Sequence, residues 1–104
     1  MKKVTLYVGL NDKTTLHQEI GTIDAYKIAQ NILAANHGGS TIHEGMGSYR
    51  MQESGALVKE NSLVCILFGV DDEKALDKSI RELKNALNQE SIGVEITESN
   101  FDYR

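Results

Sequence analysis

The chain has 104 residues, of which 40% are hydrophobic, a formal net charge of −4 and a single cysteine. This length fits one domain over residues 1-104, built around one hydrophobic core. An acidic chain lacks the basic face of proteins that bind nucleic acid polymers or anionic membranes, and a single cysteine excludes a disulfide framework within the chain.

The N-terminal segment predicts a half-buried strand. Its residues from Val4 to Val8 alternate with period two, so we expect Val4, Leu6 and Val8 to point inward and Thr5 and Tyr7 outward. This apolar stretch is too short and too interrupted for a secretory leader, and no segment approaches the roughly eighteen apolar residues of a membrane span. We therefore expect a cytoplasmic protein that does not bind membranes.

A long polar connection from Leu10 to Gly21 precedes a predicted helix over 22–35. Thr22 is a suitable N-cap, and the glycines at 38 and 39 are typical helix terminators. The second predicted helix begins after Asp71 or Asp72, either of which can cap it. Its apolar stripe recurs at helical spacing, which is typical of a helix packed on a sheet. The stripe consists of Leu76, Ile80, Leu83 and Leu87.

The remaining segments read as strands. A hairpin is predicted from residues 41–51 and 63–68, with a turn at 53–55, and a final strand from Ile92 to Thr97 has its apolar residues at alternate positions. The inward set of this last strand is Ile92, Val94 and Ile96. Cys65 lies in the most apolar run, where we expect a buried thiol.

The order strand, helix, strand, strand, helix, strand predicts an α+β fold of the ferredoxin-like βαββαβ plan. In this plan a four-stranded antiparallel sheet carries two helices on one face. The other face is left open, and the strand from Leu63 to Phe68 is apolar on both sides. Since an exposed apolar strip commonly marks an interface, we expect a homodimer or trimer packed through the open sheet face.

The mixed composition of the first hairpin strand predicts a binding groove. Gly45 and Gly47 share one face and leave room for a flat ligand or another backbone, and Tyr49 adds an aromatic wall. Arg50 reaches this face if a bulge at the glycines redirects it. Alternatively, the glycines serve strand coiling and Tyr49 fills a subunit interface. His43, on the same strand, is a further candidate for hydrogen bonding to a ligand.

Catalytic and metal-binding signatures are weak. His37 and His43 lack a third ligand at metal spacing, so we predict neither a metal nor another cofactor. No serine has a nucleophile-elbow context. Strand acids such as Glu44, Glu60 and Glu95 can in principle form a carboxylate pair, but no spacing rule brings two of them together, so we interpret them as solvated side chains.

Three segments carry a resemblance to a known family. They are Leu6-Tyr7-Val8-Gly9-Leu10, Gly47-Ser48-Tyr49-Arg50 and Asn88-Gln89-Glu90-Ser91-Ile92. They resemble a ferredoxin-like bacterial and phage family of unknown function that includes short lipoproteins, and this resemblance implies the fold without an activity. The layout is also similar to PII signalling proteins, trimers that bind nucleotides between subunits under a loop whose place is taken here by residues 51–59.

The leading hypothesis is a non-enzymatic oligomer that binds a small anionic ligand, such as a nucleotide or a nucleotide-derived signal, at an intersubunit cleft, where binding can sequester that signal. The candidate site consists of Tyr7, His43, Gly45, Gly47, Tyr49, Arg50 and Arg104. Tyrosines would stack on the flat part of the ligand and Arg50 would pair with phosphate. Two alternatives stay open: a small cofactor-free enzyme of the dimeric α+β barrel type, with His43 or Glu44 as base, and a protein-interaction or inhibitor module.

Overall fold

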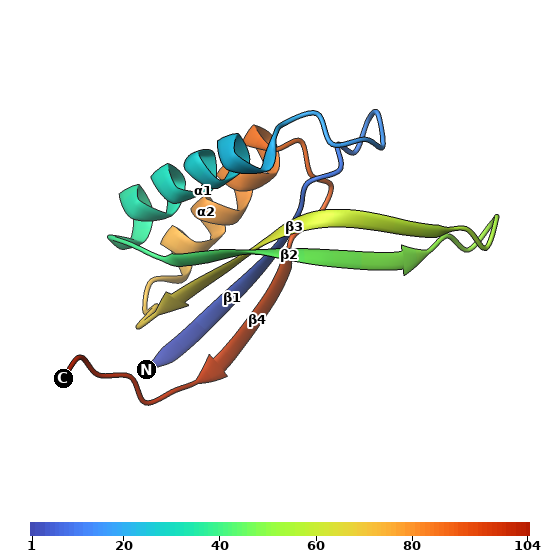
Figure 1. The fold of residues 1–104 in the computed structure, drawn as a ribbon. Coiled ribbons are helices and arrows are strands. Elements are labelled where there is room, and N and C mark those ends of the chain that lie inside the picture. The colour runs from blue at the N-terminus through green and yellow to red at the C-terminus, as the bar shows by residue number, and fades with distance from the viewer.

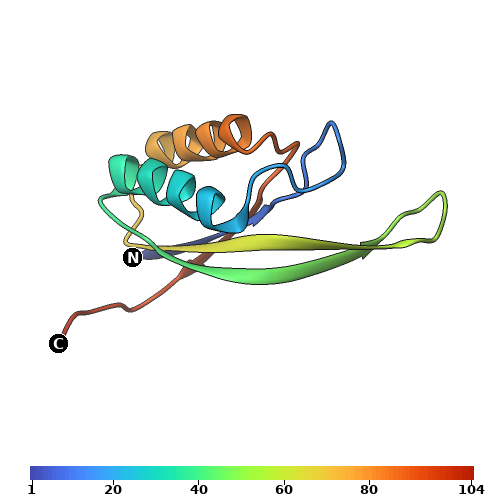
Figure 2. The same cartoon turned by 45° about the horizontal axis from the view of Figure 1, so that its top comes forward.

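The computed structural model describes residues 1–104 as four strands and two helices (Figure 1). The elements in chain order are β1 (Lys2–Gly9), α1 (Thr22–His37), β2 (Thr41–Arg50), β3 (Leu57–Phe68), α2 (Glu73–Ala86) and β4 (Gly93–Glu98). The strands form one sheet in the order β2-β3-β1-β4, and all neighbours are antiparallel. Both helices lie on the same face of the sheet (Figure 2). The ferredoxin-like fold is thereby confirmed.

The hydrophobic core lies between the helices and the two central strands. Val4, Leu6 and Val8 of β1 are all buried, as their alternation predicts. Antiparallel pairing brings the buried set of β3 beside them, since Leu6 pairs with Cys65 and Val8 pairs with Leu63. The helices close the core with Ala25, Ala29, Leu33, Leu76 and Leu83, and the C-cap of α2, Leu87, adds to it. Burial of Cys65 raises the pKa of its thiol to about 11.

The helix ends follow capping chemistry, with one difference from expectation. Gly21, not Thr22, is the N-cap of α1, and the Thr22 hydroxyl instead accepts a hydrogen bond from Gln18 Nε2 at 3.0 Å. Gly38 ends α1 in the left-handed region at φ 82°, where a glycine carries no Cβ penalty. Asp72 caps α2 by accepting from the backbone N–H groups of Lys74 and Ala75.

β4 is an edge strand that the helices do not cover. Its register places Val94 opposite Leu6 and Ile96 opposite Val4, which is the helix side of the sheet, as predicted. Both side chains are nevertheless about half exposed, because the helices lie over the neighbouring strands. The helix side of β4 is therefore an exposed apolar surface.

The hairpin of β2 and β3 extends past the helices as a free arm (Figures 1 and 2). β3 starts at Leu57, earlier than the sequence pattern indicates, because Arg50 and Leu57 close the ladder with β2. The arm gives the molecule its long dimension of 48 Å, against 25 and 23 Å for the others. Met46 and Leu57 on the arm are exposed.

No helix of the structure is both long and apolar enough to cross a membrane.

Candidate ligand-binding site

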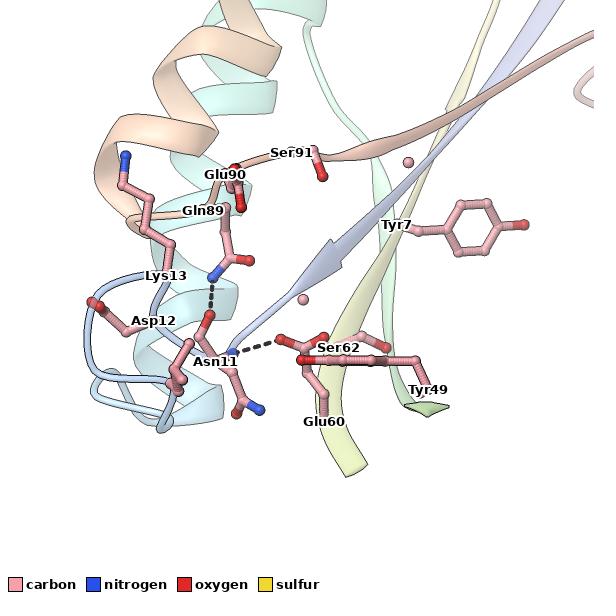
Figure 3. A pocket seen from close by; sticks show the side chains of 14 residues that line it. Tyr7, Asn11, Asp12, Lys13, Tyr49, Glu60, Ser62, Gln89, Glu90 and Ser91 are labelled. Atoms are coloured by element: carbon pink, nitrogen blue, oxygen red, sulfur yellow. Dashed lines mark hydrogen bonds between the residues drawn. The ribbon is translucent and has the colours of Figure 1, made fainter. Parts of the chain in front are cut away.

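A cleft of about 450 Å³ opens at the end of the sheet where β1 finishes and the hairpin arm begins. Its residues come from all four strands, from the loop that follows β1, and from the segment between α2 and β4 (Figure 3). Segments from the start, middle and end of the chain meet there. The cleft is mainly polar, and only three of its fourteen residues are hydrophobic.

Small residues form the floor of the cleft. Ser62 on β3 lies between Gly9 of β1 and Gly45 of β2, so this row of the sheet carries no bulky side chain. A Cβ atom at Gly9 would lie 2.6 Å from the carboxylate atoms of Glu60. Glycine at position 9 therefore creates the space that the Glu60 carboxylate occupies.

The Glu60 carboxylate is fixed by the backbone of the loop after β1. Its Oε2 accepts the backbone N–H of Asn11 at 2.9 Å, and the Asn11 carbonyl in turn accepts Gln89 Nε2 at 2.8 Å (Figure 3). Glu60 is half-buried and Gln89 is buried. A carboxylate held by a backbone donor at a cleft wall is preorganised to pair with a donor or a cation of a ligand.

Two tyrosines on the open side of the sheet also line the cleft. Tyr7 comes from β1 and Tyr49 from β2, and both are about half exposed (Figure 3). The Tyr7 hydroxyl donates to Glu95 Oε1 at 3.2 Å, and this hydrogen bond together with the negative charge of Glu95 raises the pKa of the phenol. Tyr7 therefore stays neutral at physiological pH, and both rings are available for stacking.

The loop from Leu10 to Gly21 is ordered by local hydrogen bonds. The Asp12 carboxylate accepts from Asn88 Nδ2 at 2.9 Å and from the backbone N–H groups of Thr14 and Thr15. These bonds, first that of Asn88 and then those of the two N–H groups, lower the pKa of Asp12. The loop is thus a defined wall of the cleft tied to the end of α2.

The charges of the cleft are mainly negative. Asp12, Glu60 and Glu90 contribute three carboxylates, and Lys13 is the one cationic side chain. No group of three or more His, Cys, Asp and Glu side chains is arranged to hold a metal ion. Electrostatics at this site therefore favour a neutral or cationic ligand over a phosphorylated one.

Three of the predicted site residues line this cleft: Tyr7, Gly47 and Tyr49. Gly45 lies in the same row as Gly9, on the other side of Ser62, and a Cβ at Gly45 would lie 2.9 Å from the Ser62 hydroxyl. His43 lies farther along β2, opposite Val64. Neither Gly45 nor His43 contributes to the cleft wall.

The two predicted arginines lie elsewhere. Arg50 donates to the Gly55 carbonyl at 2.6 Å in the turn of the arm. Arg104 pairs with Asp102 at 3.2 Å in the exposed C-terminal tail, which lies at the opposite end of the sheet (Figure 1). Neither predicted arginine lines the cleft within one chain.

Sequence patterns did not identify Asn11, Glu60 and Gln89 as site residues. Glu60 looks like any exposed strand acid, and the role of the other two depends on contacts between distant segments. The available signals were the unusual length of the connection after β1 and the glycine that ends the strand.

The comparisons with known proteins give structural neighbours only: no family model matches the chain, and no curated protein is similar. A phage SAM lyase in complex with S-methyl-5'-thioadenosine is 28% identical, with a TM-score of 0.69, over 93% of this chain and 80% of the other. A Bacillus cereus protein related to NIF3 is 18% identical, with a TM-score of 0.55, over 91% of this chain and 24% of that one.

The divalent ion tolerance protein CutA1 from Ehrlichia chaffeensis is 12% identical, with a TM-score of 0.53, over 97% of this chain and 84% of that one. The last two likenesses concern the fold alone. The neighbours thus come from a phage and from bacteria, and one of them is an enzyme that holds a nucleoside.

Proposed function

We propose that this protein binds S-adenosylmethionine in the cleft beside Glu60 and cleaves it to S-methyl-5'-thioadenosine. The observation that carries the proposal is the coincidence of two findings. The chain resembles a phage SAM lyase over 93% of its length, and it has a cleft with two tyrosines and a fixed carboxylate. This proposal replaces the non-enzymatic reading with the cofactor-free enzyme as the leading function.

The proposed reaction needs neither a cofactor nor an external base. S-methyl-5'-thioadenosine keeps the methyl and adenosyl groups, so the bond that breaks joins the sulfonium sulfur to the γ carbon of the amino acid part. Its electron pair stays on sulfur, which becomes a neutral thioether. The carboxylate of the same molecule forms the new bond to the γ carbon and closes a five-membered lactone. Atoms and charges balance without water.

For such a reaction the protein must bind and orient the substrate, because an intramolecular displacement depends on alignment of the reacting atoms. Tyr7 and Tyr49 supply flat surfaces for the adenine ring. The carboxylates, above all Glu60, pair with the positive charges of the substrate, which carries a sulfonium and an ammonium group.

The negative charge of the cleft also favours S-adenosylmethionine over the anionic ligand that we expected from the sequence. Lys13 is the one cationic side chain of the cleft, and Arg50, the predicted partner of a phosphate, instead binds the Gly55 carbonyl in the arm. Three carboxylates at the cleft would repel a triphosphate. A nucleoside with a positive charge suits this lining better.

Isothermal titration tests the binding part of the proposal. We expect heat of binding for S-methyl-5'-thioadenosine and none for ATP at the same concentration. The Tyr49→Ala variant removes one stacking surface at an exposed position, and it should weaken nucleoside binding by about tenfold, since one stacked base is worth roughly 1–3 kcal/mol. Binding of ATP but not of the thioadenosine nucleoside would reject the proposal and restore the nucleotide reading.

We also propose that the cleft is completed by a second copy of the chain. One subunit leaves the cleft open, with Tyr7 and Tyr49 half exposed, and the arm presents Met46 and Leu57 to solvent without a helix above it. Apolar side chains on a protruding hairpin match the uncovered helix side of β4, where Val94 and Ile96 are exposed. A head-to-tail contact of this kind generates a ring when the rotation between neighbouring copies closes.

Light scattering coupled to size exclusion tests the assembly. The wild-type protein should elute at tens of micromolar with a mass at least twice the 11.5 kDa of one chain. Leu57→Lys, a charge placed on the arm, should yield monomers that remain folded. A wild-type monomer at this concentration would contradict both the assembly and the completion of the cleft by a second copy.

A further inference from the structure

Gln89 connects the end of α2 to the loop that shapes the cleft. The residue is only 7% exposed although its side chain is polar. Its amide Nε2 donates to the carbonyl oxygens of Asn11, at 2.8 Å, and of Leu87, at 3.2 Å. Both hydrogens of the amide are thus used on backbone acceptors, and the Asn11 carbonyl is held in one direction.

The fixed Asn11 residue in turn holds Glu60. Its backbone N–H donates to Glu60 Oε2 at 2.9 Å, so one residue is bound through its carbonyl by Gln89 and through its N–H to the carboxylate (Figure 3). The backbone of Leu10 is tied to the same strand, because its N–H donates to the Asn61 carbonyl at 2.9 Å. Glu60 is thus held from the loop, and the loop is held from α2.

We infer that Gln89 is a positioning residue, which directs the Glu60 carboxylate through Asn11 toward the positively charged part of the substrate. This inference rests on the proposed function, because that function defines the positive groups to be recognised. Gln89 lies at the cleft wall, but its amide hydrogens point to backbone carbonyls, so its effect on the substrate passes through Glu60.

The chain offers a matched control for a purely structural role. Gln18 is half-buried, and its amide also joins backbone and side-chain partners around the same loop. It donates to the Ile20 carbonyl and to Thr22 Oγ1, both at 3.0 Å, and accepts from Asn61 Nδ2 at 2.8 Å. None of these contacts is made to Asn11, Gln89 or the Glu60 side chain, so loss of Gln18 removes hydrogen bonds at the far end of the loop and leaves those that link Gln89, Asn11 and Glu60 in place.

The experiment compares Gln89→Met and Gln18→Met, because methionine keeps the length of glutamine and removes its hydrogen bonds. For Gln89→Met we expect kcat/KM for S-adenosylmethionine to fall about tenfold, the loss typical of a weakened charged hydrogen bond. Affinity for S-methyl-5'-thioadenosine, which has neither positive group, should stay within about twofold. Gln18→Met should leave kcat/KM unchanged. An equal loss in both variants, or an equal loss for both ligands, would overturn the inference.

A double-mutant cycle tests whether the effect passes through Glu60. In a Glu60→Gln background, Gln89→Met should have little further effect on kcat/KM, because the charge that it positions is already absent. Full additivity of the two losses would overturn the inference.

A readout without ligand separates this inference from the proposed function. The backbone amide of Asn11 should give an NMR signal that moves in both Glu60→Gln and Gln89→Met and stays in place in Gln18→Met. If the wild-type protein neither binds the nucleoside nor cleaves S-adenosylmethionine, the proposed function fails, while this signal still decides whether Gln89 holds Asn11 against Glu60. An Asn11 signal unmoved by Gln89→Met would overturn the positioning role.

Discussion

Replacing Gly9 by alanine should disable the cleft while leaving the fold intact. A methyl group at this position would lie 2.6 Å from the Glu60 carboxylate, where ordinary contact begins at 3.4 Å. The backbone of Gly9 is in a strand and does not have a positive φ, so alanine is accepted by the main chain. The carboxylate must therefore swing away, because it is the mobile end of a flexible side chain.

The size of the effect follows from the hydrogen bond that is lost. The Asn11 N–H bond to Glu60 measures 2.9 Å, and it cannot persist once the carboxylate is displaced. A hydrogen bond to a charged group contributes about 1.5–3 kcal/mol, and its part-buried position places the value at the lower end. A displaced carboxylate also loses its charged hydrogen bond to the positive group of the substrate, which is worth a similar amount, so we expect kcat/KM for S-adenosylmethionine to fall by about tenfold or more.

The assay pairs this rate with thermal unfolding. Alanine in a strand gains roughly 0.5–1 kcal/mol relative to glycine, whereas the lost hydrogen bond costs about 1.5 kcal/mol, so the Tm of Gly9→Ala should fall by only a few degrees. Gly39→Ala serves as control, because no atom lies within 4 Å of its Cβ position and the glycine is outside the cleft. Unchanged kcat/KM in Gly9→Ala would refute the role of the Glu60 carboxylate.

Three further predictions concern titrating groups. Burial lowers the pKa of His37 below 6.5, so folding favours the neutral ring. The free energy of unfolding should therefore be highest above about pH 6.5 and decrease as the pH falls from there through the folded-state pKa. Urea midpoints should show a smaller decrease for His37→Asn. The pKa of Asp12 is lowered from its ordinary 3.8, so its carboxylate stabilises the fold above that pH, and this stabilisation is lost as the pH falls. In the same assay Asp12→Asn should be less stable than wild type at pH 7, and its stability should change less between about pH 5 and 3. An equal change with pH in both proteins would contradict this. With a pKa of about 11, about one in a thousand Cys65 thiols is ionised at pH 8. Mass spectrometry should therefore find iodoacetamide labelling of Cys65 only in denaturant. Rapid labelling of the native protein would disprove the burial of Cys65.

The fold follows from local patterns that the sequence displays openly. The period-two alternation of Val4, Leu6 and Val8 and the helical spacing of Leu76 and Leu83 each report which side faces the core. Element order then leaves few topologies for one antiparallel sheet. These signals are local, so the sequence of a single chain is enough to identify them.

Exposure at the edge of the sheet is a different kind of property. Val94 alternates as a core residue would, and it does lie on the helix side, yet it is 43% exposed. Whether a helix lies above a given strand depends on the packing of the whole layer. The alternation predicts correctly which face of the sheet Val94 lies on, but it cannot predict whether a helix covers that position.

The candidate site depends on long-range contacts to a still greater extent. Tyr7 and Tyr49 were expected from their strand positions, because an outward tyrosine beside glycines is visible in the sequence. Asn11, Glu60 and Gln89 come together only in the folded chain, with their hydrogen bonds spanning 49 and 78 residues. No spacing rule connects a loop amide, a strand acid and a residue after a helix.

The most direct test of the proposed function is to incubate the protein with S-adenosylmethionine labelled in its methyl group and to monitor the conversion by NMR. We predict that the labelled methyl appears in S-methyl-5'-thioadenosine, that the amino acid part appears as the lactone, and that Glu60→Gln slows the conversion. Intact S-adenosylmethionine after incubation with folded protein, at the rate of the protein-free control, would contradict the proposed reaction.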